Sequence, residues 1–418
     1  MINMRNIALK ISIIFNILLI FFGANIGTIL PFFNLYILDF IALFFSVIAC
    51  MKFKVKVKID TLMWILCIVF SAFSLIYTTN TEATMKFIML LFCGVMSKAL
   101  YENTSGWSDF FIKLLLIGSS VHVFFTIAEC FLPDMVSLIN SKILAYDAYT
   151  LNLSFANLGA YAGITGQTGV NAFYIAIFIG VMFSKIVTEK KGKLRNVIFL
   201  FIGIYALFLT SKRGMIVATV IAIMFTILIA SKLKLKQILK HAVIFAVFCG
   251  IGLFILFNTQ NNIINKVTSL SESGDISNGR EVFWAAGIRM FEENPVFGLG
   301  MNTMDSTLGD MVHNVYIQLL SEGGIVGFTL FMLAFIFTLI SNIKEINRLK
   351  EKNSVTIVSY VKLYVQIIFY VYSITESPLY ILYFLITYMI TSAMTYDVKK
   401  IQIEENKEGL SNNFITII

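Results

Sequence analysis

The chain is predicted to be an all-α polytopic membrane protein with about 12 transmembrane helices, and two observations predict this class. Hydrophobic residues make up 58% of the 418 residues and charged residues only 13%. Soluble domains carry about 25% charge, so lipid is the only partner that could cover so much apolar surface. The apolar residues also fall in runs close to the length of about 20 residues that a helix needs to cross a bilayer.

Apolar windows define the predicted spans. Lipid offers no partner for backbone polar groups and the alternation typical of a barrel strand is absent, so each span is predicted to be a helix. We expect one integral membrane domain over residues 1–418, with outer loops at 132–167 and 258–313. The windows are 9–30, 32–51, 60–78, 83–100, 110–131, 168–188, 196–211, 214–231, 241–257, 315–340, 355–372 and 377–396.

Lysine and arginine orient these spans. If the N-terminus is cytoplasmic, 23 of the 32 basic residues fall in cytoplasmic segments and six in outer segments. Because positive charge gathers on the cytoplasmic side, we predict that both termini are cytoplasmic and that both large loops lie outside. The net charge of +8 is thereby assigned to loops that meet anionic lipid, and nucleic acid is not an expected partner.

Arg280 lies in the predicted outer loop, against the charge bias that orients the rest of the chain. Asn278 and Glu281 have the spacing of a capping box, and Pro295 ends the helical pattern that follows. Arg280 would therefore stand in the first turn of a helix, where backbone N–H groups already favour an anion. An anionic substrate is the functional interpretation; lipid headgroups, or pairing with Glu281 or Glu292, are the alternatives.

His313 and Asn314 stand immediately before the window that begins at residue 315. Histidine ionises close to working pH and can accept a proton from an attacking sugar hydroxyl. His313 is therefore a candidate base, while Asn314 and the nearby Glu322 are candidates for substrate binding. A helix cap or an interface residue is the alternative interpretation of this histidine.

Further cations lie in a short turn and along the predicted helix. Lys212, Arg213 and Gly214 join two spans at the outer edge of the hydrocarbon, where a charge is usually functional and needs a partner. The alternative is a pair of side chains that snorkel to the interface. Arg289, which follows Arg280 by nine residues, lies roughly 180° round an ideal helix; it is a candidate for substrate binding or for headgroup contact.

One block of residues carries a resemblance to a known family. It reads Gly279-Arg280, Trp284, Asn294-Pro295-x-Phe297-Gly298-x-Gly300 and His313-Asn314-x-Tyr316-x-x-x-Leu320-x-Glu322-x-Gly324-x-x-Gly327. The block resembles the signature of the O-antigen polymerase and O-antigen ligase family of bacterial membrane glycosyltransferases. Arg213-Gly214, in the preceding outer turn, belongs to the same pattern.

The resemblance implies a fold and a reaction. The expected fold is a type C glycosyltransferase bundle whose large outer loop contains short amphipathic helices. The expected reaction is an inverting transfer of sugar, without metal or other cofactor, on the outer face of the bacterial plasma membrane. The donor would be a glycan on undecaprenyl pyrophosphate and the acceptor a glycan hydroxyl, with a chain-length regulator and a flippase as further candidate partners.

The resemblance and the charges together select the expected site. His313, Arg280 and Arg213 are the catalytic candidates, and Lys212, Asn314, Glu322 and Arg289 are the substrate-binding candidates. Fixed positive charge from the two arginines could stabilise a leaving pyrophosphate in place of a divalent ion. Asp305 and Asp310 are the loop carboxylates that could instead bind a cation.

Several functions remain open at this point. We favour a polymerase that joins repeat units of O-antigen, capsule or exopolysaccharide. A ligase that transfers the glycan to lipid A core or to protein is the alternative within the family. Outside it are a flippase or transporter, which would tend to show paired repeats and interrupted helices, and a non-catalytic scaffold.

Overall fold

The computed structural model describes residues 2–30, 35–51, 56–189, 191–230, 280–309, 312–352 and 354–395. These residues form helices and connecting loops, and no strand occurs among them. The first half contains α1 (Ile2–Ile29), α2 (Leu35–Cys50), α3 (Ile59–Phe73), η1 (Ser74–Ile76), α4 (Thr81–Glu102), α5 (Ser108–Phe131), α6 (Pro133–Ile143) and α7 (Tyr146–Asn157). The second half contains α8 (Thr168–Thr188), α9 (Lys193–Leu209), α10 (Arg213–Ala230), α13 (Arg280–Glu293), α14 (Met304–Leu308), α15 (Val315–Glu351), α16 (Ile357–Tyr372), η2 (Pro378–Tyr380) and α17 (Leu382–Ala393).

The helices confirm the polytopic membrane class. Each predicted window contains a helix, except 241–257, which lies outside the described residues. Seven described helices are long and apolar enough to cross a membrane, and three shorter apolar helices accompany them. The predicted number of 12 spans and the type C arrangement stay predictions.

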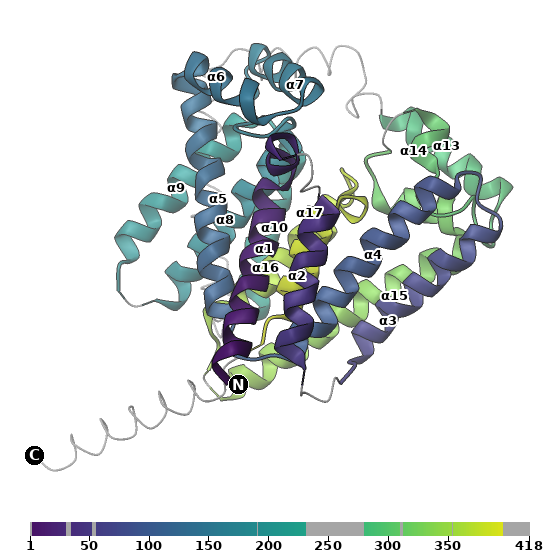
Figure 1. Ribbon diagram of the computed structural model, residues 1–418, viewed down its shortest axis with the longest axis horizontal. Helices are drawn as coiled ribbons and strands as arrows, with labels where there is room; N and C mark the ends of the chain where they lie inside the picture. The colour runs from purple at the N-terminus through teal and green to yellow at the C-terminus, as the bar shows by residue number, and fades with distance from the viewer. Residues whose placement is uncertain are drawn as a thin grey trace, which may run out of the picture.

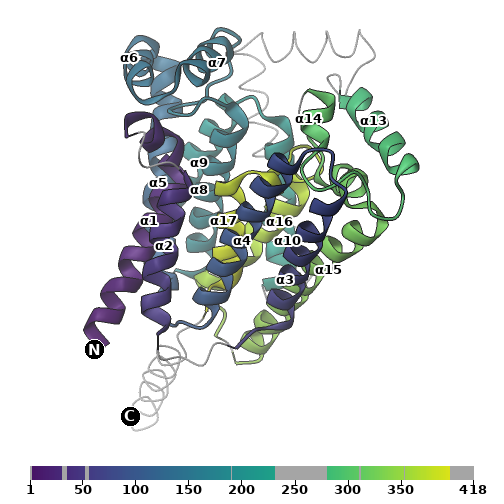
Figure 2. The same ribbon diagram turned by 45° about the vertical axis from the view of Figure 1, so that its right-hand side comes forward.

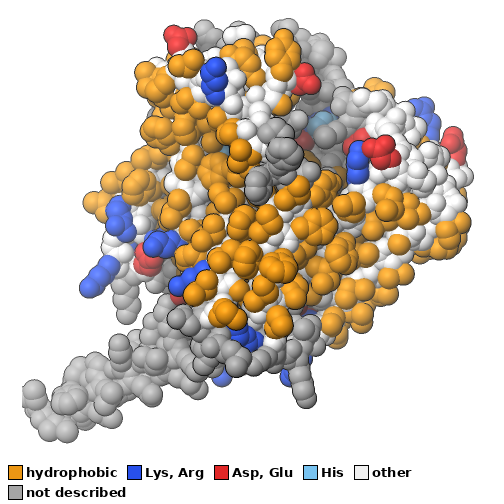
Figure 3. All heavy atoms as spheres, viewed as in Figure 1, with side chains coloured by type: hydrophobic (Ala, Val, Ile, Leu, Met, Phe, Trp, Pro, Cys, Tyr) orange, Lys and Arg blue, Asp and Glu red, His pale blue; other side chains and the backbone are white. Residues whose placement is uncertain are grey.

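The long helices run side by side, and the short ones gather at one end. Figures 1 and 2 show α6, α7, α13 and α14 at this end, and the beginning of α1 at the other. We call it the α13 end. On the face seen in Figure 3, apolar side chains cover the middle of the molecule and most charged side chains lie toward the two ends. This distribution is typical of a protein surrounded by lipid.

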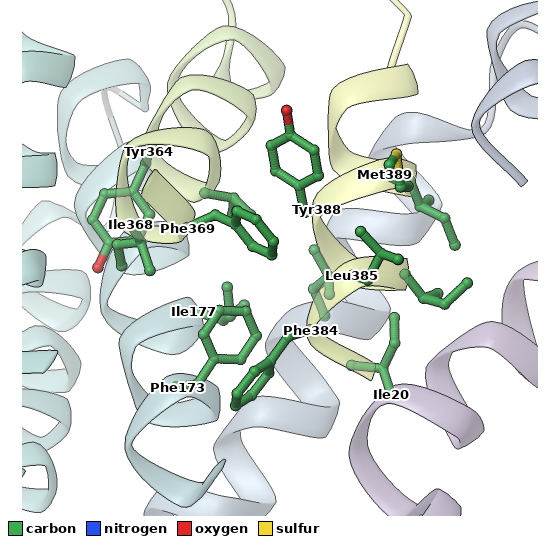
Figure 4. Close-up of a cluster of buried hydrophobic side chains, with 14 of the residues drawn as sticks. Ile20, Phe173, Ile177, Tyr364, Ile368, Phe369, Phe384, Leu385, Tyr388 and Met389 are labelled. Atoms are coloured by element: carbon green, nitrogen blue, oxygen red, sulfur yellow. The ribbon is translucent and has the colours of Figure 1, made fainter. Parts of the chain in front are cut away.

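The interior is built around α8, which packs against α5, α9, α10 and α16. Figure 4 shows how side chains of α8, α16, α17 and α1 point toward one another in this core. The Phe173 and Phe384 ring centroids are 4.2 Å apart, and those of Phe369 and Tyr388 are 4.4 Å apart. Because lipid tails are as apolar as these side chains, the helices associate through close packing and not through exclusion of water.

Helix α15 is interrupted near its start, and the chain that precedes it fills the gap. The N–H groups of Leu299 and Gly300 donate to the carbonyls of Ser321 and Glu322, at 3.1 and 3.0 Å. In a regular helix, those two carbonyls would accept from residues 325 and 326. These two residues donate instead to the carbonyls of Pro295 and Val296, at 2.9 and 3.2 Å. Segment 295–300 therefore satisfies every backbone group that the opened helix releases at these positions.

Two glycines make this contact sterically possible. Gly324 has a φ of 57° inside α15, and a Cβ atom there would lie 2.4 Å from the carbonyl of Val296. Gly298 has a φ of 69°, and its Cβ would lie 2.4 Å from the carbonyl of Glu322. Both positions require a left-handed backbone and tolerate no side chain. The two glycine-containing motifs of the sequence thus form the two sides of one backbone contact.

Replacing Gly324 with Ala should destabilise the protein by about 3 kcal/mol or more, because backbone strain and a clash with Val296 act together. Gly309→Ala is the matched control: Gly309 also has a positive φ, of 76°, but a Cβ atom there would meet no heavy atom within 4 Å. We expect the control to cost about 1 kcal/mol. Thermal unfolding of the purified protein in detergent measures both. Equal losses in the two variants would contradict the packing role of Gly324.

Candidate active site

Four side chains from four segments meet at the α13 end, with Glu376 at their centre. One carboxylate oxygen, Oε2, lies 2.7 Å from Nδ1 of His313. The other, Oε1, lies 3.3 Å from a guanidinium nitrogen of Arg280 and 3.4 Å from Nζ of Lys212. We call Lys212, Arg280, His313 and Glu376 the charge cluster. It unites the α9–α10 turn, the start of α13, the residues before α15 and the segment after α16.

His313 is fixed by bonds on both sides of it in the chain. Trp284 of α13 donates from its indole N–H to the Val312 carbonyl at 3.1 Å. The backbone N–H of Val315 donates to the Ser373 carbonyl at 2.9 Å. His313 itself has a φ of 54°, a left-handed conformation that histidine adopts more readily than most residues. The imidazole is thereby held between α13 and the segment that carries Glu376.

Arg280 begins α13 as described, in agreement with the predicted placement of this residue in the first turn of a helix, and α13 rests on α15. Gly287 allows the close approach, since a Cβ there would lie 2.7 Å from a methyl carbon of Ile317. The Ser321 hydroxyl then donates to the Gly287 carbonyl at 2.8 Å. The helix that the sequence predicted around Arg280 is confirmed, whereas its proposed cap at Asn278 lies outside the described residues.

Lys212 reaches Glu376 from the tight turn between α9 and α10. Ser211 takes a φ of 56° in this turn. Gly214 then lets α10 approach the segment after α16, since a Cβ at Gly214 would lie 2.6 Å from the Thr375 hydroxyl. Lys212 is 30% exposed in its side chain and Glu376 is 14% exposed, so this ion pair is partly withdrawn from solvent.

The surroundings of Glu376 favour its charged form. Burial alone would raise the pKa of this carboxyl, but the hydrogen bond from His313 and the nearby cations outweigh burial and lower the pKa from 4.5 to about 2. The carboxylate is therefore ionised at any physiological pH. Lys212 and Arg280 contribute two positive charges against this one negative charge, so the cluster keeps a surplus of positive charge even with a neutral imidazole.

Two of the predicted binding residues are engaged within the protein. Glu322 is fully buried. Its carboxylate accepts from the backbone of Asn302 and Met304, from the Tyr380 hydroxyl and from the Gln318 amide, at 2.7 to 3.1 Å. The Glu322 carboxylate therefore links the loop before α14 to α15 and η2, and it does not lie at an open surface.

Asn314 caps α15. Its side-chain oxygen accepts from the backbone N–H groups of Tyr316 and Ile317, at 3.0 and 3.1 Å. The sequence analysis considered a helix cap at His313, and the cap is instead the next residue, Asn314. The cap orients the first turn of α15 and so fixes the direction in which the chain leaves His313.

Arg213 and Arg289 are not part of the charge cluster. Both side chains are exposed, and neither makes a hydrogen bond or ion pair with any residue in the described part of the chain. The turn that contains Arg213 thus brings its neighbour Lys212 to Glu376. The catalytic role of Arg213 and the binding role of Arg289 stay predictions.

Glu376 itself is not among the residues that the sequence singled out. A signal was present: Glu376 is a lone carboxylate between the apolar windows 355–372 and 377–396, and the charge rule puts the junction of those windows on the outer side. An acidic residue so close to the hydrocarbon needs a cationic partner. The segments predicted to lie outside contain few cations, which would have directed attention to Lys212 and Arg280.

The geometry suits the binding of an anionic ligand and the acceptance of a proton by His313. Lys212 and Arg280 converge on one carboxylate oxygen, and paired cations of this kind suit phosphate oxygens. Nδ1 of His313 is bonded to Glu376, while its other ring nitrogen has no hydrogen-bond partner among the described residues. As for a metal, no group of three or more His, Cys, Asp or Glu side chains within the described ranges could hold one. Asp310 lies outside those ranges, and independence from metal stays a prediction.

Comparison with known families agrees with the motifs. Residues 198–332 match a family model described as O-antigen ligase, which confirms the resemblance to the O-antigen polymerase and ligase family. No curated protein matches the chain. The matched segment contains Lys212, Arg280 and His313 but ends before Glu376.

The ion pairs of Glu376 should stabilise the protein down to mildly acidic pH. Because the pKa of Glu376 is lowered from 4.5 to about 2, its contribution is complete above pH 4.5 and disappears as the pH falls to 2. We expect the free energy of unfolding of the wild type to be larger than that of Glu376→Gln by on the order of 1–3 kcal/mol near pH 6. This difference should shrink below pH 4.5. Thermal unfolding of both proteins from pH 6 to pH 3 measures it. A difference that grows on acidification would contradict the assignment.

Proposed function

We propose, from the match of residues 198–332 to the O-antigen ligase family, that this protein is a polysaccharide polymerase. It joins oligosaccharide repeat units carried on undecaprenyl pyrophosphate, by an inverting glycosyl transfer that uses no metal ion. The reaction takes place at the α13 end, on the outer face of the bacterial plasma membrane. The observation that carries the proposal is the convergence of Lys212, Arg280 and His313 on one carboxylate.

The cations of the cluster bind the diphosphate of the donor. When the bond between the anomeric carbon and the diphosphate oxygen breaks, negative charge develops on that oxygen. Preorganised positive charge at this position lowers the barrier, and the effect is large in a site shielded from water. Arg280 presents a planar fork that matches two phosphate oxygens, whereas Lys212 acts as a point charge. Arg213, adjacent to Lys212 and free of described ion pairs, is available for the second phosphate.

His313 acts as the base. Its free ring nitrogen accepts the proton of the acceptor hydroxyl while the hydroxyl oxygen forms the new glycosidic bond. The old bond breaks in the same step, and undecaprenyl pyrophosphate leaves with the bonding electron pair. Attack from the side opposite the leaving group inverts the anomeric configuration. Protonated His313 then returns its proton to solvent.

The ligase differs from the polymerase only in its acceptor, and the transporter differs in carrying out no chemistry. A reconstituted assay separates the three functions. Purified protein in liposomes receives undecaprenyl-pyrophosphate-linked repeat units, with a chelator present throughout. Longer carrier-linked glycans support the polymerase. Transfer only to an added lipid A core or protein supports the ligase, and movement across the bilayer without a new bond supports the transporter.

Replacing Arg280 with Lys keeps the charge but removes the planar fork. We expect polymer formation to fall by about 100-fold in the reconstituted assay, with normal amounts of folded protein. Arg195→Lys, the same change at an exposed residue of α9, serves as the control and should retain wild-type activity. Wild-type polymer length in the Arg280 variant would count against diphosphate binding by this guanidinium.

Replacing His313 with Asn removes the base and suits the backbone, since Asn tolerates the left-handed conformation that His313 occupies. We expect transfer to fall by about 100-fold or more, the contribution of a general base. Binding of undecaprenyl pyrophosphate, measured by titration of the purified protein, should persist. Retained transfer, or lost binding with intact chemistry, would reject His313 as the base.

A further inference from the structure

We infer that Glu376 has two opposed effects on this site: it positions His313 for proton transfer, and it competes with the donor diphosphate for Lys212 and Arg280. The inference rests on the proposed function and deepens it. Glu376 lies outside the matched segment, and its assignment comes from the contacts of its two carboxylate oxygens.

The two oxygens divide their partners. Oε2 is bonded to Nδ1 of His313 at 2.7 Å, and Oε1 faces both Arg280 and Lys212. A ligand that draws the two cations away therefore leaves the histidine contact in place. The carboxylate can lose one set of partners without releasing the other.

The distances agree with an exchange of partners. The histidine contact has the short separation of a charge-assisted hydrogen bond, about 2.7–2.9 Å. The contacts to Arg280 and Lys212 are 3.3 and 3.4 Å, at the long limit for a hydrogen bond. Both cationic side chains are also partly exposed, at 25% and 30%. A diphosphate carries more charge than one carboxylate and offers more acceptor oxygens, so it takes over these two cations.

Glu376 is well placed to hold the imidazole in one orientation. Its own backbone N–H donates to the Tyr372 carbonyl at 2.9 Å, and Pro378 begins η2 shortly after it. The Ser377 hydroxyl donates to the Gln318 side-chain oxygen of α15 at 3.1 Å. With Nδ1–H donated to Glu376, the proton-accepting nitrogen of His313 is the other one. Once the diphosphate has taken the cations, the negative charge of Glu376 acts on His313 alone and favours the imidazolium that forms during transfer.

The two effects produce a signature that a purely structural residue would not give. Glu376→Gln keeps the size of the side chain but removes its charge. Lys212 and Arg280 then lose their competing anion, so donor binding should become about 10-fold tighter. His313 loses the charge that favours its protonated form, so kcat should fall by about 100-fold. Glu293→Gln, the same change at an exposed residue of α13, is the matched control and should alter neither quantity.

The experiment measures binding and turnover separately at pH 7.5, on the full chain in detergent or liposomes. Binding uses undecaprenyl pyrophosphate alone as the probe, and kcat comes from glycan extension at saturating donor. Tighter binding with slower turnover supports both effects of Glu376. Binding and turnover that fall together, or a variant identical to wild type, would overturn the inference.

Failure of the proposed function gives a different result. A wild-type protein that binds no undecaprenyl pyrophosphate would remove the donor site and, with it, the competition by Glu376. The other case is a wild-type protein that binds the probe and extends glycan, while Glu376→Gln binds the probe more weakly. This result would support the proposed function and reject only the two effects of Glu376.

Discussion

The position of the candidate site depends on one backbone contact, the insertion of segment 295–300 into the opened start of α15. An interrupted helix near the hydrocarbon is costly unless each released N–H and carbonyl finds another partner within the protein. Segment 295–300 supplies those partners, and Gly298 and Gly324 remove the side chains that would prevent it. Because α13 ends where this segment begins, the contact fixes α13, and through it Arg280, against the bundle.

The charge cluster is a second constraint, of a different physical kind. Its members come from segments far apart in the chain, and each alone would be a charged or polar group close to lipid in need of a partner. Glu376 provides that partner to three of them at once. Because these contacts are partly buried, they stabilise the fold more than an exposed ion pair does, whose net contribution is small. The remaining exposure of the cations leaves them accessible to a ligand.

The family motif divides into residues that build the site and residues that can act in it. Gly298, Gly324, Glu322 and Asn314 make backbone contacts, a buried clamp and a helix cap. Arg280 and His313 present polar atoms to a shared, partly open place. The sequence motif does not separate these two groups, because a buried glutamate that holds a loop in place and a glutamate that binds substrate are the same residue type.

Sequence alone determined the membrane class, the positions of the described helices and the helix that begins at Arg280, and it selected Arg280 and His313 as candidate site residues. These follow from apolar runs, charge bias and helix start signals, all of which act locally along the chain. Only the tertiary structure decided that Lys212 and not Arg213 reaches the cluster, that Glu322 is a clamp, and that Glu376 stands at the centre. Which of two adjacent cations points into a site depends on how helices pack. That packing brings together Lys212 and Glu376, which lie 164 positions apart, a separation over which no local pattern carries information.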